Sequence, residues 1–441
     1  MNVLNKIEQF IFYFLIFAIP FQTRKLLWQQ NWYFNEYQAI FIYGTDILML
    51  VLFAFWLFRR PKLRVDRYDY LLLAFVVVSA FSIKNSSSHI LSVWNVLKLI
   101  EFVLFYFYIK SYAVYKFGFS RSLFALIAGG VFQSVVAILQ FWKQSSLGLR
   151  YFGESPLGPD LSGIASFYDF YGRKVIRAYG TTPHPNILAA YLFLAIFAFY
   201  FTYLYYHIYH RKEVYHPKLN IFLLASYPLM LLALFYTFAR VMIFAWLAGF
   251  TIRACVVLGK KKFRDIFAHG INRVKLTKIL VISTVVVVLF GAIYWPQAIS
   301  RGRVSSGEEA VQLRLFYNRE SLKALNWFGV GSGNFVNWLM VKDPNLARYF
   351  YQPVHNIYIL IYSENGILGV ALFILFLVFL VKDFINDSKM SKFYHFSFLI
   401  LFLSILFVGL FDHFLWTLQE GRLMFWLLCS LLTFNKINDI N

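Results

Sequence analysis

The stretch VHNIYILIYSENGILG (residues 354–369) carries a histidine, an asparagine and a glutamate on a run that is otherwise strongly apolar. An apolar segment of about 18 to 20 residues is long enough to cross a bilayer as a helix. Polar side chains are costly near hydrocarbon and usually face the interior of a helix bundle or a water-filled cavity. We therefore expect a transmembrane helix here, in which His355, Asn356 and Glu364 serve structure or function.

The rest of the chain has the same apolar character. Its 441 residues are 60% hydrophobic and 21% aromatic, and its mean hydropathy is +0.61, which is far outside the range of a soluble domain of this length. The sequence predicts an all-α fold, a single integral membrane domain over residues 1–441 with about twelve transmembrane helices. The predicted helices begin near residues 7, 39, 68, 91, 119, 184, 219, 240, 276, 357, 396 and 414.

Other classes of protein fit these features poorly. The first apolar stretch, about residues 7–21, lacks a small-residue cleavage site, so we expect a retained first helix and a mature chain that starts at Met1. The formal charge of +21 comes from basic residues that lie between apolar runs and do not gather in one soluble patch. This pattern does not favour nucleic-acid binding. Cys255 and Cys429 both lie in apolar runs, so neither a disulfide framework nor a thiolate metal site is expected.

Lysine and arginine cluster in loops that fall on one side of the predicted membrane. These loops are residues 59–67, 210–218 and 260–275. Basic loops mark the cytoplasmic side of a membrane protein. With an even number of helices, both termini are then expected in the cytoplasm.

Two long connections fall on the opposite side, at about residues 143–183 and 295–354. Neither contains an obvious strand, and connections of this length more often have a function than not. The second is predicted to be a large extracytoplasmic loop with short helices, because a polar amphipathic segment precedes a glycine-rich turn there.

Ionisable and polar residues from separate segments meet on this predicted outer side. Such groups usually point into a bundle or a wet cavity. We expect that they form one site. The residues are His184, Arg240, Arg314, His355, Asn356, Asp412 and His413.

Each of these residues also has a simpler interpretation. His184 lies between two prolines and could shape a loop, and Arg240 could extend toward lipid phosphate. Glu364 is expected to be structural, because it lies about 13 Å along a helix from His355. Lys98 and Arg253, which lie within predicted spans, are expected to form interior pairs or to extend toward the interface.

The residue types on the outer side suit one kind of chemistry. Arginine presents a rigid fork of donors that matches phosphate oxygens and keeps its charge in any setting. Two converging arginines could therefore hold a pyrophosphate, while a histidine takes a proton from an attacking hydroxyl at neutral pH. No outward Asp-x-Asp pair occurs, and the outer acids Glu154, Asp160 and Asp169 are scattered, so we expect a reaction without a metal or other cofactor.

Four short motifs follow one another in the order and spacing of a known family. They are LRLFYNRESLKAL (313–325), GVGSGNF (329–335), HNIYIL (355–360) and SENGILG (363–369). Together they resemble the shared domain of O-antigen ligases and O-antigen polymerases, in which an arginine-bearing loop helix, a Gly-Val-Gly turn, His-Asn and Glu-x-Gly-x-x-Gly succeed one another. The resemblance covers about residues 225–380. One departure is that Ala-Arg-Val stands at residues 239–241, where the family often has Ser-Arg-Gly.

This resemblance implies an inverting membrane glycosyltransferase of the C-type architecture in the bacterial plasma (inner) membrane. Such an enzyme moves a glycan from an undecaprenyl-pyrophosphate carrier to a glycan, lipid or protein acceptor at the outer membrane face. By position, Arg240 and Arg314 match the two arginines of the family pattern and His355 matches its general base. His184, Asn356, Asp412 and His413 are expected to bind substrate, with no metal and no nucleic acid involved.

Two functions of other classes stay open. A transporter or flippase of lipid-linked saccharides would need polar groups through the whole depth of a pathway, often at broken helices. A scaffold for envelope assembly would need no such outer set of arginines and histidines. Whether the enzyme is a ligase or a polymerase, and which sugar it moves, does not follow from the residues.

Overall fold

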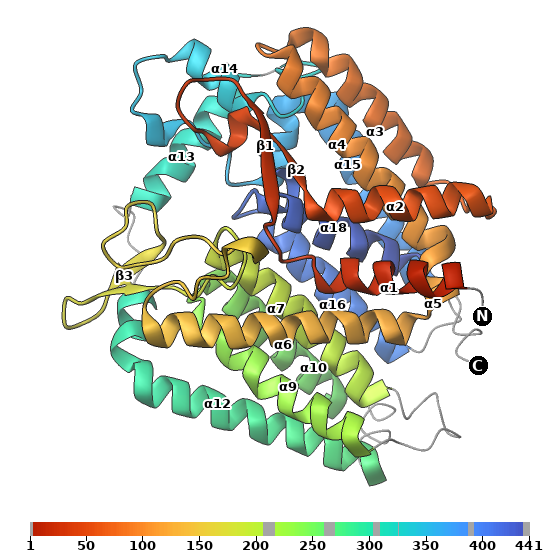
Figure 1. The fold of residues 1–441 in the computed structure, drawn as a ribbon, viewed down its shortest axis with the longest axis vertical. Coiled ribbons are helices and arrows are strands. Elements are labelled where there is room, and N and C mark those ends of the chain that lie inside the picture. Colours follow the sequence, from red (N-terminus) through yellow and green to blue (C-terminus); the bar gives the residue numbers. More distant parts are fainter. Residues whose placement is uncertain are drawn as a thin grey trace.

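A computed structural model describes residues 3–205, 217–259, 270–302, 309–324, 326–386 and 392–434. The protein is mostly helical, and long helices lie side by side in one bundle (Figure 1). The long helices are α1 (Val3–Phe17), α2 (Gly44–Arg59), α3 (Asp69–Ser82), α4 (His89–Tyr108), α6 (Phe119–Lys143), α7 (Pro185–Tyr200), α9 (Pro217–Tyr236), α10 (Arg240–Gly259), α12 (Gly270–Gly302), α15 (Ile357–Asn386), α16 (Lys392–Val408) and α18 (Gln419–Leu432).

Six helical segments of the described residues are long and apolar enough to cross a membrane. They are His89–Phe117, Phe119–Lys143, Pro185–Leu204, Lys218–Tyr236, Arg273–Arg301 and Ile357–Asn386. This confirms a multi-pass membrane protein with several apolar helices. A helix begins close to every start predicted from the sequence. The remaining helices are too short or not apolar enough to count as membrane-crossing, so the number of twelve stays a prediction.

The expected helical fold is confirmed in its main part, and two short hairpins, which were not expected, accompany the helices. Residues 39–43, predicted as the start of a span, form β2 (Ala39–Tyr43), which pairs with β1 (Arg24–Gln29) as an antiparallel hairpin before α2 begins. The connection at 143–183, predicted without strands, contains the hairpin of β3 (Ser166–Tyr168) and β4 (Lys174–Ile176). Period-two patterns this short are easily overlooked beside much longer apolar runs.

Small helices occupy the connection between α12 and α15. They are α13 (Glu309–Leu322), α14 (Phe335–Lys342) and the 3₁₀ turn η6 (Arg348–Phe350). Since α12 continues to Gly302, the irregular part of this connection begins later than residue 295. The β3–β4 hairpin, α13 and α14 lie at one end of the bundle, and both ends of the chain lie at the other (Figure 1).

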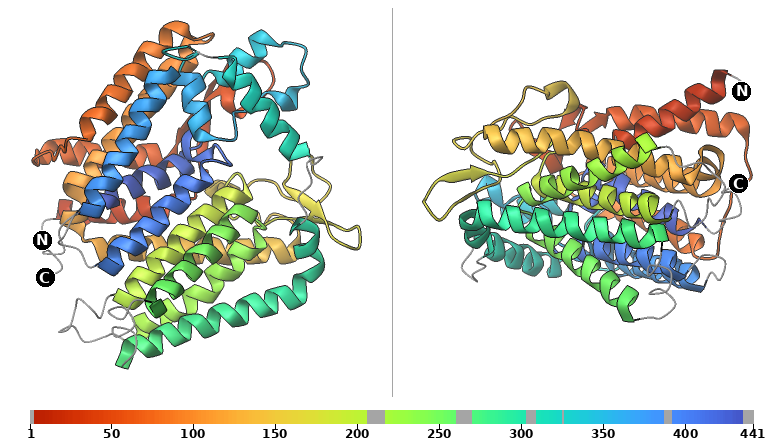
Figure 2. Two further views of the ribbon diagram at one scale, coloured as in Figure 1. Left: turned by 180° about the vertical axis from the view of Figure 1, so that it is seen from behind. Right: turned by 90° about the horizontal axis from the view of Figure 1, so that it is seen from below.

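The core of the bundle surrounds α7. Every residue of the most apolar stretch of α7 is buried, whereas only 11% of the most apolar stretch of α12 is buried inside the protein. Figure 2 shows α12 along one edge of the bundle in the left view and across its near face in the right view. Because α7 is held by neighbours on all sides, its first residues are fixed in position, and the candidate site lies there.

Two buried ion-pair clusters lie on the segment His89–Phe117. Lys98 Nζ lies 2.6 Å from Asp46 and 2.8 Å from Glu101. Lys110 Nζ lies 2.5 Å from Asp69 and 2.8 Å from a second carboxylate. The interior pair expected for Lys98 is thus confirmed, and Arg253 lies 4.1 Å over the ring of Phe197.

The glycine motifs of the family pattern join two segments through their backbones. Helix α15 is interrupted at Gly366, where φ is 72°, and the turn at 326–331 fits against this break. A Cβ atom at Gly366 would lie 2.2 Å from the Trp327 carbonyl oxygen, and one at Gly329 would lie 2.3 Å from the Glu364 backbone, so only glycine fits. The bonds are Val330 N to Ser363 O (2.9 Å), Gly331 N to Glu364 O (3.1 Å), Ile367 N to Asn326 O (3.2 Å) and Leu368 N to Trp327 O (3.4 Å).

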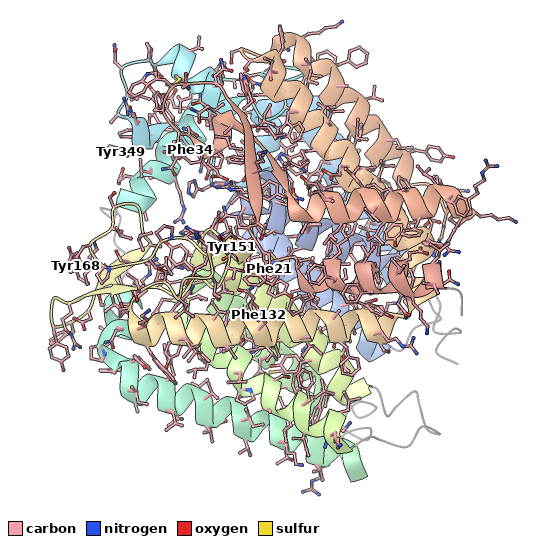
Figure 3. All side chains as sticks on the ribbon, viewed as in Figure 1. Phe21, Phe34, Phe132, Tyr151, Tyr168 and Tyr349 are labelled. Atoms are coloured by element: carbon pink, nitrogen blue, oxygen red, sulfur yellow. The ribbon has the colours of Figure 1, made fainter. Side chains whose placement is uncertain are left out.

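Several aromatic side chains belong to the connections between helices, among them the labelled Phe34, Tyr151, Tyr168 and Tyr349 (Figure 3). Phe21 packs against Phe132, with ring centroids 5.5 Å apart, and so joins the end of α1 to α6. Tyr151 and Tyr168 are exposed on the connection between α6 and α7, and Tyr349 is exposed on the connection between α14 and α15. Exposed tyrosines of this kind are typical of a membrane–water interface.

Candidate active site

A cavity of about 440 Å³ lies where the first residues of α7 and α15 meet the short helices. We call it the arginine cavity. It collects five of the residues that were predicted from the sequence to form one site, together with several that were not. The predicted residues are His184, Arg314, His355, Asp412 and His413, and the others include Glu36, Tyr37, Arg177, Asn186 and Arg301.

His184 begins α7. Its ring Nδ1 accepts a hydrogen bond from the Asn186 backbone N–H at 3.1 Å, and Pro185 occupies the first helical position, where its missing N–H costs nothing. Since Nδ1 is an acceptor here, the proton of the neutral ring sits on Nε2. His184 therefore both caps the helix and offers an N–H donor, which unites the two interpretations that the sequence left open.

His355 precedes α15 and has the opposite tautomer. Its Nδ1 lies 3.1 Å from the Pro353 carbonyl oxygen, which can only accept, so Nδ1 carries the proton and Nε2 is the basic atom. Among the described residues Nε2 has no hydrogen-bond partner. The ring stacks on Tyr317 at a centroid distance of 5.9 Å. His355 is thereby oriented with a basic nitrogen available to a ligand in the cavity.

His413 lies beside His355, with ring centroids 4.8 Å apart. Its Nδ1 lies 2.7 Å from the Thr417 hydroxyl, which itself donates to the His413 carbonyl oxygen, so Nδ1 donates and Nε2 accepts. The Tyr37 hydroxyl lies 3.4 Å from this Nε2. The basic nitrogen of His413, Nε2, thus already has the Tyr37 hydroxyl as a partner, unlike the basic nitrogen of His355.

Burial keeps the three imidazoles uncharged at neutral pH. It lowers the pKa of His184 and of His413 to about 3, and it lowers the pKa of His355, against the opposing effect of Asp412. The pKa of Asp412 falls to about 2 despite burial, through the attraction of His413, His355 and His184 when these are protonated and through the hydrogen bond from the Asn186 amide. The cavity therefore combines neutral bases with one ionised carboxylate.

Arg177 is nearly inaccessible to solvent and was not predicted from the sequence. Its Nε donates to the Thr237 carbonyl oxygen and its Nη2 to Asn186 Oδ1, both at 2.6 Å. Asn186 Nδ2 then donates to Asp412 at 2.8 Å. Burial and the neighbouring Arg301 lower the pKa of Arg177 to about 9, which leaves the guanidinium charged at neutral pH.

Three further arginines approach the same region. Arg314 of α13 lines the arginine cavity, and its Nε is buried with no hydrogen-bond partner among the described residues. Arg240 lines a smaller adjoining cavity of about 70 Å³, which Arg301 and Arg314 also line. Arg240 Nη1 donates to the Arg301 carbonyl oxygen at 3.4 Å. The arginines thus concentrate at one end of the arginine cavity.

Two predicted site residues lie elsewhere. Asn356 does not line the arginine cavity, because its side-chain oxygen caps α15 by accepting from the backbone N–H groups of Tyr358 (2.9 Å) and Ile359 (3.2 Å). Glu364 lines a different cavity and accepts a long bond of 3.5 Å from the Phe335 N–H. The structural role predicted for Glu364 stays a prediction, as do the roles of all the site residues.

The two carboxylates of the arginine cavity already have partners. Glu36 pairs with Arg24, and Asp412 accepts from Asn186 and from the His413 N–H at 2.8 Å. Within the residues that the structure describes, no group of three or more His, Cys, Asp or Glu side chains is arranged to hold a metal ion. Positive charge in the cavity is supplied by guanidinium groups.

Comparison with known proteins finds a family model that matches part of the chain. No curated protein matches the chain. Residues 225–374, which include Arg240, Arg301, Arg314 and His355, match the family model described as O-antigen ligase. This part of the chain is therefore similar to O-antigen ligases.

Proposed function

We propose that the protein is a membrane glycosyltransferase that moves a glycan from undecaprenyl pyrophosphate to an acceptor hydroxyl in the arginine cavity. Support comes from one observation above all. Arginines and a neutral imidazole with an available basic nitrogen line the same space. This combination provides both groups that the displacement of a diphosphate requires.

The arginine end of the cavity suits the diphosphate. Among the described residues, Arg177 donates its hydrogen bonds to neutral oxygens and the buried Nε of Arg314 has no partner, so both can accept a dianion. As the bond to the sugar breaks, negative charge builds on the departing phosphate oxygen. Guanidinium groups fixed in a buried site stabilise that charge more than they stabilise the substrate.

The reaction balances as a single displacement. His355 Nε2 takes the proton of the acceptor hydroxyl, whose oxygen forms a bond to the anomeric carbon of the donor sugar. The bond between that carbon and the phosphate oxygen breaks, and its electron pair leaves with undecaprenyl pyrophosphate. Attack opposite the leaving group inverts the anomeric configuration, and no metal is required if the arginines replace it.

The proposed location is the outer face of the bacterial plasma membrane. The basic loop at 59–67 follows α2, and both ends of the chain lie at the end of the bundle away from the β3–β4 hairpin (Figure 1). If basic loops mark the cytoplasm, both termini are cytoplasmic and the helix ends near the hairpin are extracytoplasmic.

A transporter of lipid-linked saccharides is the alternative from another class. Lys98 and Lys110 bring charge to further depths of the bundle, about 18 Å apart along their segment. However, each lies against two carboxylates, so these charges are neutralised inside the protein. Paired charges of this kind favour a structural role over a pathway.

Reconstitution tests the proposal against this alternative. The purified chain in liposomes is mixed with an undecaprenyl-pyrophosphate glycan and candidate acceptors, and the products are analysed by mass spectrometry. A new glycosidic product together with free undecaprenyl pyrophosphate is the expected result. Movement of the carrier between leaflets without product would instead establish a transporter.

A further inference from the structure

A second cavity adjoins the arginine cavity on the side away from most of the arginines. We call it the aromatic cavity. Glu36, Tyr37 and Leu418 line both cavities, so the two are contiguous. The aromatic cavity has a volume of about 70 Å³, and its walls include Tyr43, Trp94, Asn95, Trp416, Gln419 and Arg422.

Two of the three imidazoles, those of His355 and His413, lie at the boundary between the two cavities. The Tyr37 hydroxyl and the Thr417 hydroxyl, which hold His413, both belong to residues that line the aromatic cavity. Pro353, whose carbonyl oxygen orients His355, lines it as well. Arg301 and Arg314 instead line the arginine cavity and the small cavity of Arg240. His355 and His413 therefore lie between the aromatic cavity and the end of the arginine cavity at which Arg301 and Arg314 adjoin the small cavity.

The walls of the aromatic cavity suit a sugar ring. Sugars present apolar C–H faces that pack on aromatic rings, and hydroxyl groups that bond to fixed polar side chains. Arg422 is such a fixed group, because its Nε donates to the Trp416 carbonyl oxygen at 2.5 Å and its Nη2 to Asn95 at 3.0 Å. The volume holds about five waters, a space comparable to that of one sugar ring.

We propose that the aromatic cavity binds the sugar ring of the acceptor that carries the attacking hydroxyl. This rests on the proposed function, in which the diphosphate leaves toward the arginines. A displacement places the nucleophile and the leaving group on opposite sides of the anomeric carbon. The attacking hydroxyl then enters past His355 from the aromatic cavity, and its own ring occupies that cavity. The acceptor is accordingly a glycan, and not a protein side chain or a lipid alcohol.

Binding is the first test. The full chain in nanodiscs is titrated with methyl glycosides of common hexoses and N-acetylhexosamines, followed by saturation-transfer NMR. We expect at least one glycoside to bind, binding to weaken about tenfold in Trp94→Ala, and binding to recover in Trp94→Tyr. Trp295→Ala, which removes an exposed tryptophan of α12, is the matched control and leaves binding unchanged. Absence of binding for the whole panel, or full binding in Trp94→Ala, overturns the proposal.

A kinetic test separates this proposal from the proposed function. In the reconstituted transfer reaction, Trp94→Ala raises the KM for the glycan acceptor about tenfold while the KM for the lipid-linked donor stays unchanged. If the wild-type protein forms no glycosidic product, the proposed function fails. If it forms product and Trp94→Ala leaves the acceptor KM unchanged, or the only acceptor is a protein or a lipid alcohol, the sugar subsite fails while glycosyl transfer stands.

Discussion

Arg177 and Lys110 are both buried cations, with exposed fractions of 4% and 2%, yet their surroundings differ. Lys110 lies between two carboxylates, those of Asp66 and Asp69. Within the described residues, Arg177 donates its hydrogen bonds to neutral oxygens, and it lines a cavity. A buried charge is costly unless an opposite charge accompanies it. The bundle supplies that charge to Lys110, and we expect an anionic substrate to supply it to Arg177.

The largest expected effect concerns the base that works beside these arginines. His355→Ala should reduce glycan transfer by about 10²- to 10⁴-fold, because the acceptor hydroxyl then loses its proton acceptor. Single-turnover transfer in liposomes measures it. The control is His89→Ala, which removes an exposed histidine at the start of α4 and should leave transfer intact. Near wild-type transfer by His355→Ala would remove this residue as the base.

Arg314 tests whether an arginine without a carboxylate partner acts on the leaving group. Arg314→Ala should reduce kcat by about 10²- to 10³-fold, the cost of losing one fixed donor to a developing oxyanion. Arg314→Lys should recover part of the rate, since it keeps the charge but not the fork. Arg319→Ala, on an exposed position of the same helix, is the control. Full activity in Arg314→Ala would show that this charge has no part in catalysis.

The contrast between Arg177 and Lys110 can be tested directly with one substitution type. Arg177→Met should lose about 10²-fold in transfer and keep its thermal stability, because no carboxylate is left unpaired. Lys110→Met should instead lose roughly 3 to 5 kcal/mol of stability, because two carboxylates then lack their partner. Unfolding is followed by labelling of the buried Cys429 thiol in a Cys255→Ser background. Equal losses of stability in both variants would contradict the comparison.

The sequence predicted the fold better than it predicted the site. Long apolar runs indicated where helices begin, since hydrocarbon imposes a minimum length on every crossing. The hairpins at 24–43 and 166–176 were missed, because strands of three to six residues carry little periodic signal. Arg177 was missed as well, although KVIRAYGTTPHPN places it seven positions before His184, because a connection without periodicity gives no direction for a side chain.

The chemistry of the predicted residues depended on contacts that no sequence pattern contains. Asn356 follows His355 directly, but successive residues at a helix start face different directions, and its amide caps α15. His355 and His413 are both histidines at helix starts, and only their hydrogen bonds show which basic nitrogen is available. The grouping of polar residues on one side was therefore predictable, whereas their individual roles were not.

The pH dependence of kcat/KM gives a smaller effect, which tests His355 as the general base. Burial lowers the pKa of His355 below its usual 6.5, so the ring stays unprotonated and active under mildly acidic conditions. We expect kcat/KM to be constant between about pH 7 and pH 8 and to fall below about pH 6.5. Arg314→Lys should keep this acid limb, and His355→Ala should lack it. A rate that still rises between pH 7 and pH 8 would show a base with a raised pKa.

Metal removal should have the smallest effect. Hard cations are held by carboxylate oxygens, and the two carboxylates of the arginine cavity are engaged by Arg24 and by Asn186. The leaving diphosphate meets guanidinium groups instead, which need no further counter-ion. Transfer should therefore be unchanged by EDTA, measured with protein and lipids stripped of divalent ions. If EDTA abolishes transfer and Mg²⁺ or Mn²⁺ restores it in the wild type, the arginines do not replace a cation, and Arg177 and Arg314 would bind the diphosphate only together with a metal.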